Sequence, residues 1–440
     1  CIRDRSSTMF YNRNISMMGY LASFSIMATL AACSDDDVSG PVFDPNVPPQ
    51  NVQVVSGDSS STEVKNTISW TEDPTATDYV VYVSNTPDVT DSSSEVVPTL
   101  EGADFVTHSG TDVIAGTPLY YRVQALSATQ SSVLSAEVTG TPQQSITTNN
   151  LNDVAWNGTD TLVAVGDVGA IITSPNGLQD GWTSTAVGGL AESLSAVTWN
   201  DSPSQFLIVG AGLTVLGGDG TTWNQADMSN ISIAASGDLE DVAWVVDRYV
   251  AVGKNNLVIT SPDGSDSSWT VQNGGDLSDN VTLLGVASNG DGSKTVAVGT
   301  NGTLLTSDNR GETWIPWTVT ESNSLNDVTW DGSQFIVVGA TGTVYTSTDG
   351  IDWQKSTLVS VDSAFNGVTQ WDSSLPTDPI LAIVGATGDF IVFPDATTAL
   401  FIRTGTTEPL SANTWVDDGV NPAYFVIVGH DGFVLTSQTQ

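Results

Sequence analysis

An apolar segment that ends in glycine recurs along the second part of the chain. Its glycine stands at seven positions, 40 to 46 residues apart: Gly166, Gly210, Gly253, Gly299, Gly339, Gly385 and Gly429. A period of this length, built from short β-type segments, is typical of β-propellers, in which each unit folds into one four-stranded blade. The sequence therefore predicts an all-β protein with a seven-bladed β-propeller over residues 145–440.

The fullest unit, residues 325–353, shows how one blade is divided. Strands a, b and c are expected around Val328, at 334–338 and at 343–347, and strand d after Trp353. The segment 347–353 between c and d reads STDGIDW and resembles an Asp-box, a hairpin turn shaped by Asp and Gly with a Trp packed between blades. Variants stand at 174–182, 218–223, 261–269 and 307–314, and a second ladder marks strand a with Trp156, Trp199, Trp244 and Trp330.

Across residues 151–437 these units resemble the propellers of photosystem II assembly and stability factors, and more distantly the sialidase-like propellers. The resemblance implies a platform for binding or assembly, and it does not indicate a photosynthetic partner. Those assembly factors are associated with a basic patch, whereas this region has six basic residues: Arg248, Lys254, Lys294, Arg310, Lys355 and Arg403. The resemblance therefore informs the fold more than the function.

The last unit halts at GFVLTSQTQ, after its strand c. An open sheet edge at this point would invite aggregation, so a strand from elsewhere should complete the blade. Residues 144–149 lie just before the first unit and are predicted to supply this strand.

Residues 51–143 form a separate predicted domain of short alternating segments. Period-2 segments separated by Gly, Pro, Asp and Ser clusters argue for a β-sandwich. Trp70, Tyr79, Tyr82 and the segment 121–125 resemble those of a fibronectin type III domain, a family whose members mostly serve as spacers or adhesive surfaces.

The amino terminus has the pattern of a lipoprotein signal. Arg13 precedes the apolar stretch 17–32, which is shorter than a membrane span and ends at Leu30-Ala31-Ala32-Cys33. This tetrapeptide resembles the lipobox of bacterial lipoproteins, which implies cleavage after residue 32 and lipid attachment at Cys33. Residues 1–8 are interpreted as upstream of the true start, and the acidic, Pro-rich residues 33–50 as an extended tether. Ser34 favours delivery to the outer membrane.

The charge balance excludes several classes of partner. The chain has 11 Lys and Arg against 50 Asp and Glu, a net charge of -39, which repels phosphate backbones and excludes nucleic-acid binding. Two His and two Cys are too few for a zinc site or a cysteine protease, and no cofactor is expected. Most of the acidity is interpreted as a means of solubility.

No catalytic constellation is found in the sequence, so the protein is not predicted to be an enzyme. Arg248, Arg310 and Arg403 occupy different phases of their repeats, whereas a sialidase needs three convergent arginines. His108 lies in the predicted sandwich and His430 in a b–c hairpin, and neither stands near a nucleophile elbow. The b–c turns are all very short, which indicates a flat face suited to binding.

One repeated acid is a weak candidate for a metal site. Asp153, Asp241 and Asp327 stand at the start of strand a in the first, third and fifth units, where they could ring the mouth of the central channel. A ring of carboxylates would suit calcium or a cationic partner. The favoured alternative is that each Asp caps a backbone turn in its own blade.

Together these patterns predict a monomeric lipoprotein of the bacterial cell envelope that binds an unknown protein or glycan through its propeller. Two alternatives stay open at this stage. The chain could be a carbohydrate-binding or carbohydrate-active surface protein, or an assembly factor for a membrane complex. Exposed tryptophans on one face would support the first, and tryptophans buried between blades would count against it.

Overall fold

The computed structural model describes residues 43–60, 63–92, 94–98, 104–109, 113–114, 117–141, 147–177, 181–233, 237–272, 274, 280–319, 322–356, 362–371, 380–395, 398–404, 406–417 and 423–438. The predicted signal sequence, Cys33 and most of the tether lie outside these residues. The regular structure in the described part of the chain consists of β-strands and three-residue 3-10 turns. No helix in that part is long and apolar enough to cross a membrane.

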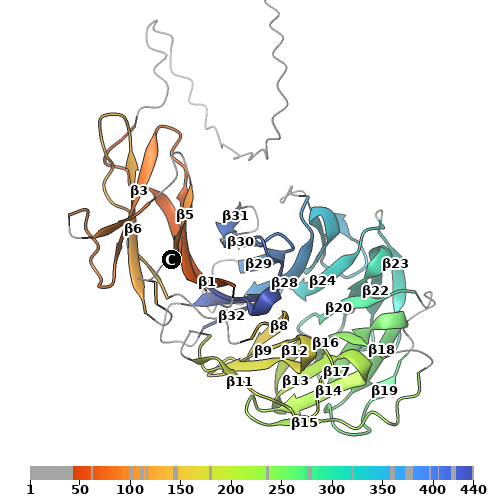
Figure 1. The fold of residues 1–440 in the computed structure, drawn as a ribbon. Helices are drawn as coiled ribbons and strands as arrows, with labels where there is room; N and C mark the ends of the chain where they lie inside the picture. Colours follow the sequence, from red (N-terminus) through yellow and green to blue (C-terminus); the bar gives the residue numbers. More distant parts are fainter. Residues whose placement is uncertain are drawn as a thin grey trace, which may run out of the picture. The chain divides into compact units, whose positions relative to one another are not determined.

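Six antiparallel four-stranded sheets follow one another from residue 151 to residue 403, each with its strands in chain order (Figure 1). Apolar b-strands at their centres are buried on both faces, which explains their continuous Val, Ile and Ala content. Blade 1 contains β8 (Leu151–Trp156), β9 (Leu162–Gly166), β10 (Ile171–Ser174) and β11 (Thr183–Ser184); blade 2 contains β12 (Leu194–Asp201), β13 (Ser204–Gly210), β14 (Thr214–Gly218) and β15 (Trp223–Gln225); blade 3 contains β16 (Leu239–Val245), β17 (Arg248–Gly253), β18 (Leu257–Ser261) and β19 (Thr270–Val271). Blade 4 contains β20 (Leu283–Ser288), β21 (Thr295–Gly299), β22 (Thr303–Ser307) and β23 (Ile315–Thr318); blade 5 contains β24 (Leu325–Trp330), β25 (Phe335–Gly339), β26 (Thr343–Ser347) and β27 (Gln354–Lys355); blade 6 contains β28 (Phe365–Trp371), β29 (Ile380–Gly385), β30 (Asp389–Asp395) and β31 (Thr398–Arg403).

These sheets form the blades of a closed propeller, as the sequence period predicts. The first strand of each blade contacts the first strand of the next, and β32 (Leu410–Val416) of the seventh blade contacts β8 of the first. A separate cluster of buried hydrophobic side chains lies between each pair of neighbouring blades, including the pair that closes the ring. The first strands therefore surround a central channel.

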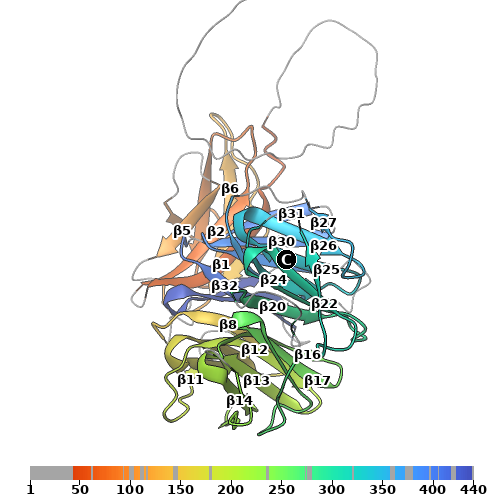
Figure 2. The same cartoon turned by 90° about the vertical axis from the view of Figure 1, so that its right-hand side faces the viewer.

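The seventh blade is completed by a strand from the beginning of the described chain. After β32, β33 (Tyr424–Gly429) and β34 (Val434–Gln438), the next strand in the sheet is β1 (Gln50–Ser60), with Val55 opposite Ser437 and Ser56 opposite Thr436. Figures 1 and 2 both show β1 beside the blue strands of blade 7. The prediction that residues 144–149 close the blade is wrong, because β1 already occupies the free edge of β34.

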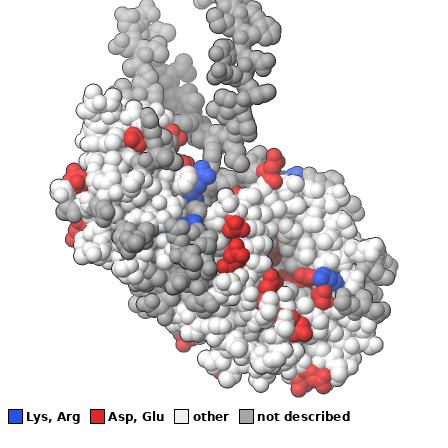
Figure 3. Space-filling model, in the orientation of Figure 1, with Lys and Arg blue, Asp and Glu red and all other residues white. Residues whose placement is uncertain are grey.

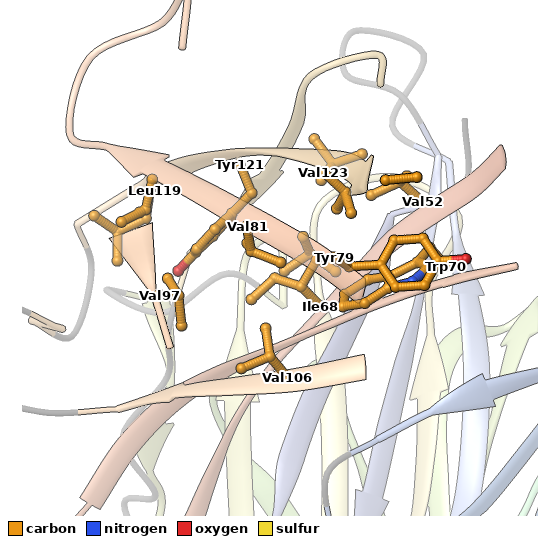
Figure 4. Packing of buried hydrophobic residues seen from close by; sticks show 14 of the residues in the cluster. Val52, Ile68, Trp70, Tyr79, Val81, Val97, Val106, Leu119, Tyr121 and Val123 are labelled. Carbon is orange, nitrogen blue, oxygen red and sulfur yellow. The ribbon is translucent and has the colours of Figure 1, made fainter. Parts of the chain in front are cut away.

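The same strand β1 is shared with a second, smaller pair of packed sheets, built from residues between 50 and 140 and here called the smaller domain. On its other edge β1 pairs with β2 (Glu63–Thr71), which pairs with β5 (Phe105–Ser109). Val52 and Val54 face a core formed with the sheet β4-β3-β6-β7, in which Figure 4 shows Val52. Val55 packs instead among blade-seven residues. The facing strands are β3 (Asp78–Ser84), β4 (Glu95–Val97), β6 (Leu119–Leu126) and β7 (Val138–Gly140).

The turns between strands c and d hold their shape through local hydrogen bonds. In blade 5 the Ser347 hydroxyl accepts from the Gly350 amide at 2.9 Å, and Asp349 Oδ1 accepts from two amides that follow it. Gly350 has φ +70°, which an L side chain rarely adopts, and its carbonyl accepts from Trp353 Nε1 at 3.2 Å. This explains the Ser, Asp, Gly and Trp positions that the sequence repeats.

A buried asparagine in the seventh blade leads to a stability prediction. Asn413 is 4% exposed, and neither amide atom has a hydrogen-bond partner among the described residues. The other six blades place valine at the corresponding position: Val154, Val197, Val242, Val286, Val328 and Val368. Because an unsatisfied buried amide is destabilising, we expect Asn413→Val to raise the free energy of unfolding by about 1–2 kcal/mol.

Denaturant titration of the two proteins measures this gain. Val368→Asn, the reverse change in blade 6, should lower the free energy of unfolding by a similar amount. A loss of stability in N413V would show that the Asn413 amide is bonded in solution.

Candidate functional site

Each blade begins with a β-bulge at the same place. In blade 1, Leu151 pairs with Gly166 and Asp153 with Val165, so the intervening Asn152 is the extra residue. The same register shift occurs in every blade, and a bulge of this kind redirects the side chain of the extra residue. The seven bulge residues are Asn152, Ser195, Glu240, Leu284, Asn326, Asn366 and Ser411.

The repeated glycines exist because the bulge brings two backbones together. A Cβ on Gly253 would overlap the carbonyl oxygen of Asp238, which lies just before strand a of the same blade. That carbonyl accepts a hydrogen bond at 3.0 Å from the amide of Lys254. An amide directly after the repeated glycine makes the equivalent bond, at 2.8 to 3.0 Å, in all seven blades. The glycine thus fixes the entry of strand a against the end of strand b.

The bulge residues of six blades line one cavity at the mouth of the central channel. Its volume is about 490 Å³, and its walls are strongly polar. Residues from the b–c turns and the d–a connections complete the wall, so the cavity belongs to the face that carries the short hairpins. The lining comprises Asn152, Asp167, Ser193, Ser195, Ala211, Asp238, Glu240, Lys254, Leu284, Asn326 and Asn366.

Blade 3 supplies the strongest charges at this mouth. Lys254 Nζ donates to Asp238 Oδ2 at 2.7 Å and stands 3.8 Å from Glu240 Oε1. The hydrogen bond from Lys254, together with the Gly212 amide, lowers the pKa of Asp238, whereas burial raises the pKa of Glu240. Acidic side chains outnumber basic ones on the face drawn in Figure 3 and gather around a hollow in it.

The three aspartates predicted as a weak metal site each accept one backbone hydrogen bond from their own blade and one from the next blade. Asp153 Oδ1 accepts from the Val154 amide, and Asp153 Oδ2 accepts at 2.8 Å from the Val197 amide of blade 2. Asp241 and Asp327 make the same bonds to blades 4 and 6. Within the described part of the chain, no three His, Cys, Asp or Glu residues are grouped so as to hold a metal ion.

Two glycines in the even blades avoid a clash with the backbone of the next blade. Gly285 stands where Asp327 stands in the next blade, and a Cβ on it would lie 2.9 Å from the Cα of Asp327. A Cβ on Gly367 would lie 2.8 Å from the Ser411 carbonyl oxygen. The alternation of acid and small residue in the sequence therefore follows from tight packing around the channel.

The same aspartates give the propeller a pH-dependent stability. Burial raises the pKa of Asp241 to about 6, and burial together with the charge of Asp241 raises the pKa of Asp327 to about 7. The folded protein therefore binds protons that the unfolded chain, with an aspartate pKa of about 3.9, does not. This stabilisation is present at low pH and is lost as the pH rises through 6 to 7.

We therefore expect the melting temperature to rise as the pH falls from 8 to 5. Below that range, aspartates with a lowered pKa such as Asp349 and Asp263 become protonated, and stability should fall again. Asp327→Asn should flatten the rise between pH 8 and pH 5. A melting temperature that climbs steadily from pH 5 to pH 8 would contradict this assignment.

The residues weighed for catalysis lie in structural positions. Arg310 of the c–d turn of blade 4 pairs with Asp247 of the a–b turn of blade 3. Arg248, the first residue of β17, pairs with Glu312, and Arg403 pairs with Asp104. These arginines do not converge on the channel. His108 bonds Tyr121 in the core of the smaller domain, and His430 begins the turn η7 (His430–Gly432).

The aspartates that the sequence suggested for the channel mouth are not the residues that line it. The lining side chains belong to the residue directly before each of these aspartates. The bulge residue comes directly after the Leu or Phe that opens strand a and directly before the repeated Asp or small residue. Comparing the seven units at that position would have shown a mostly polar set with one acid, Glu240, and one apolar residue, Leu284.

Comparison with known proteins supports the propeller fold. No protein-family model matches the chain, and no curated protein sequence matches it. A structure of YCF48 bound to a D1 peptide is similar over 68% of this chain and 94% of its own, with a TM-score of 0.54 and 14% identity. YCF48 from Cyanidioschyzon merolae covers 67% and 97% with a TM-score of 0.51 and 14% identity.

A third similar structure is also a β-propeller domain. It is the Cps50 (Swd1) β-propeller domain of Myceliophteria thermophila, which covers 68% of this chain and 98% of its own, with a TM-score of 0.52 and 12% identity. At sequence identities this low, the structural similarity establishes a shared fold and nothing more. The chain is therefore an all-β protein with a β-propeller.

Proposed function

We propose that the protein is a non-catalytic binding module that holds a protein partner at the mouth of its propeller. The observation that carries this proposal is the polar cavity of about 490 Å³ lined by the bulge residues of six blades. Ligand sites are usually concave, and their binding residues often lie on turns that a rigid scaffold holds in place. The neighbour solved with a D1 peptide supports a peptide or protein as the class of ligand.

The tryptophans favour a protein over a glycan. Every tryptophan whose side chain the structure describes is buried or half-buried. Strand-a tryptophans pack on aromatic residues of strand b, with ring centroids 4.7 Å apart in the pairs Trp199–Phe206, Trp244–Tyr249, Trp330–Phe335 and Trp415–Phe425. A sugar-stacking surface needs an exposed aromatic face, so we do not propose carbohydrate binding.

Site-specific photo-crosslinking tests the proposal in the cells that produce the protein. A benzophenone amino acid at Ser195, in the cavity wall, should yield discrete adducts with a partner protein. The matched control replaces Ser293, an exposed residue in the a–b turn of blade 4 on the opposite face. Adducts that form equally from both positions, or from neither, would contradict binding at the mouth.

We further propose that the protein is a lipoprotein of the bacterial envelope, attached at Cys33 after removal of residues 1–32 and directed to the outer membrane. The lipobox-like segment 30–33 supports this. The smaller domain would act as a fibronectin type III-like spacer, and the c–d turns would be Asp-boxes.

Radiolabelled palmitate tests the lipid anchor. The label should enter the wild type and not Cys33→Ala, and globomycin should block processing of the wild type. Labelling of the variant would contradict attachment at Cys33.

A further inference from the structure

We infer that the mouth cavity binds a guanidinium or ammonium group presented by the partner polypeptide, with Glu240 as its main contact. This inference deepens the proposed function and rests on it. Three features of the cavity support it: the hydrogen-bonding groups of the asparagines, the charge of blade 3, and the apolar side chain of Leu284 in the wall.

The asparagines present acceptors to the cavity. Their amide nitrogens are engaged by the next blade: Asn152 Nδ2 donates to the Leu194 carbonyl at 2.8 Å, Asn326 Nδ2 to Phe365 at 2.7 Å and Asn366 Nδ2 to Leu410 at 2.8 Å. The described contacts give no donor to the three Oδ1 atoms. Each amide nitrogen carries two N–H groups. Asn152 uses both, the second to Asp167 Oδ1 at 3.3 Å, and Asn326 and Asn366 use one each. The Oδ1 atom of each amide can only accept, so the three asparagines offer acceptors to a cationic ligand.

The charges at the mouth favour the same kind of ligand. The described lining carries three carboxylates, Asp167, Asp238 and Glu240, against one ammonium, Lys254. Asp238 is bonded to Lys254 Nζ and to the Gly212 amide, and Asp167 accepts from Asn150 and Asn152. Glu240 has Lys254 at 3.8 Å, beyond hydrogen-bond distance, although its side chain is only 24% exposed. Its carboxylate is therefore the acceptor most available to an incoming cation.

The neighbouring bulge residue explains why a long basic side chain suits the site. Leu284 of blade 4 occupies the position next to Glu240 of blade 3 in the ring and is half-buried in the same wall. Arginine and lysine carry methylene stems that pack on apolar surface while the charged head stays in a polar environment. Glu240 and Leu284 together would hold the head and the stem of one side chain.

Changes at Lys254 and at Glu240 should affect binding of a cation in opposite directions. The Lys254 ammonium partly neutralises Asp238 and Glu240, so it competes electrostatically with a cationic ligand. Removing the ammonium should strengthen binding, whereas removing the Glu240 charge should weaken it. A purely structural role for the two residues would make both changes act in the same direction.

The experiment is calorimetric titration at low ionic strength with the pentapeptide acetyl-Gly-Gly-Arg-Gly-Gly-amide. We expect Glu240→Gln to weaken binding about tenfold, Lys254→Met to strengthen it, and Asp291→Asn, an exposed acid on the opposite face, to leave it unchanged. The peptide with citrulline in place of arginine, which is neutral and similar in shape, should bind weakly and respond to none of these variants.

Equal affinity of the wild type and E240Q for the arginine peptide would overturn the inference, and so would an equal loss in D291N. Free arginine amide that binds as tightly as the peptide would overturn the polypeptide part of it. Tight binding of both the arginine and the citrulline peptides, with crosslinks from Ser195, would overturn the cation and leave the binding function standing. Absence of Ser195 crosslinks would instead count against the binding function itself.

Discussion

Val55→Asp is expected to lower the free energy of unfolding by about 3–5 kcal/mol. Val55 is 2% exposed and packs among blade-seven residues such as Phe425 and Phe433. A carboxylate there would be buried without a partner. Because β1 belongs to both the smaller domain and blade 7, the change should lower the unfolding midpoint of both parts of the protein together.

Differential scanning calorimetry and denaturant titration would measure this effect. The matched control is Val96→Asp on β4, where the valine is 50% exposed and the strand is not part of the shared sheet. We expect V96D to change the free energy of unfolding by less than about 0.5 kcal/mol. If V55D unfolded no more easily than V96D, the side chain of Val55 would not be buried against blade 7.

Gly253→Ala is expected to destabilise the propeller by about 3 kcal/mol and to disturb the mouth cavity. The glycine has an extended backbone at φ -175°, so its conformation alone would allow alanine. Glycine is required at this position for a steric reason, because the methyl group of alanine would overlap the Asp238 carbonyl oxygen. The entry of strand a would have to move, and Asp238 and Glu240 would move with it.

Gly188→Ala serves as the control, because a Cβ at Gly188 would meet nothing within 4 Å. We expect G188A to keep the unfolding midpoint and the titration behaviour of the wild type. The arginine-peptide titration should show weaker binding for G253A than for G188A even at temperatures where both are folded. A fully stable G253A protein would show that the backbones at the bulge are less closely packed.

The propeller itself could be predicted from the sequence because its blades repeat the same physical requirement. Each needs a glycine where strand b ends against the bulge, so the period of the glycines counts the blades. The aromatic ladders could be found for the same reason, since Trp244 and Tyr249 pack together within one blade. A structural requirement that recurs in every blade appears in the sequence as a regular spacing of the same residue types.

The closing strand could not be found from sequence neighbourhood. Residues 144–149 are adjacent to the first blade along the chain, whereas β1 is separated from it by the rest of the smaller domain. One local sign was present: Val54 and Val55 are adjacent apolar residues in a strand that otherwise alternates, and both faces of β1 are buried there. Adjacent apolar residues in a short strand indicate burial on both faces.

The sequence indicated part of the candidate site. It pointed to the residue that follows each residue lining the cavity. Asp153, Asp241 and Asp327 stand out because they alternate with small residues, but their carboxylates accept bonds from the next blade. The mouth is formed by the preceding residue, which only the register shift of the bulge turns toward the channel. A bulge is a pairing property of two strands and leaves little trace in one strand's sequence.

β1 closes the propeller beside β34 and so holds together the ring that carries the mouth cavity. A cysteine pair tests it directly in a chain whose Cys1 and Cys33 are replaced by serine. Ser56 and Thr436 are directly opposite each other in the antiparallel ladder, a position from which two cysteines can form a disulfide. On oxidation we predict that Ser56→Cys with Thr436→Cys gives a disulfide that links the first and last strands and raises the melting temperature. A free thiol in this pair, with a disulfide instead between Asn149→Cys and Thr436→Cys, would contradict the account.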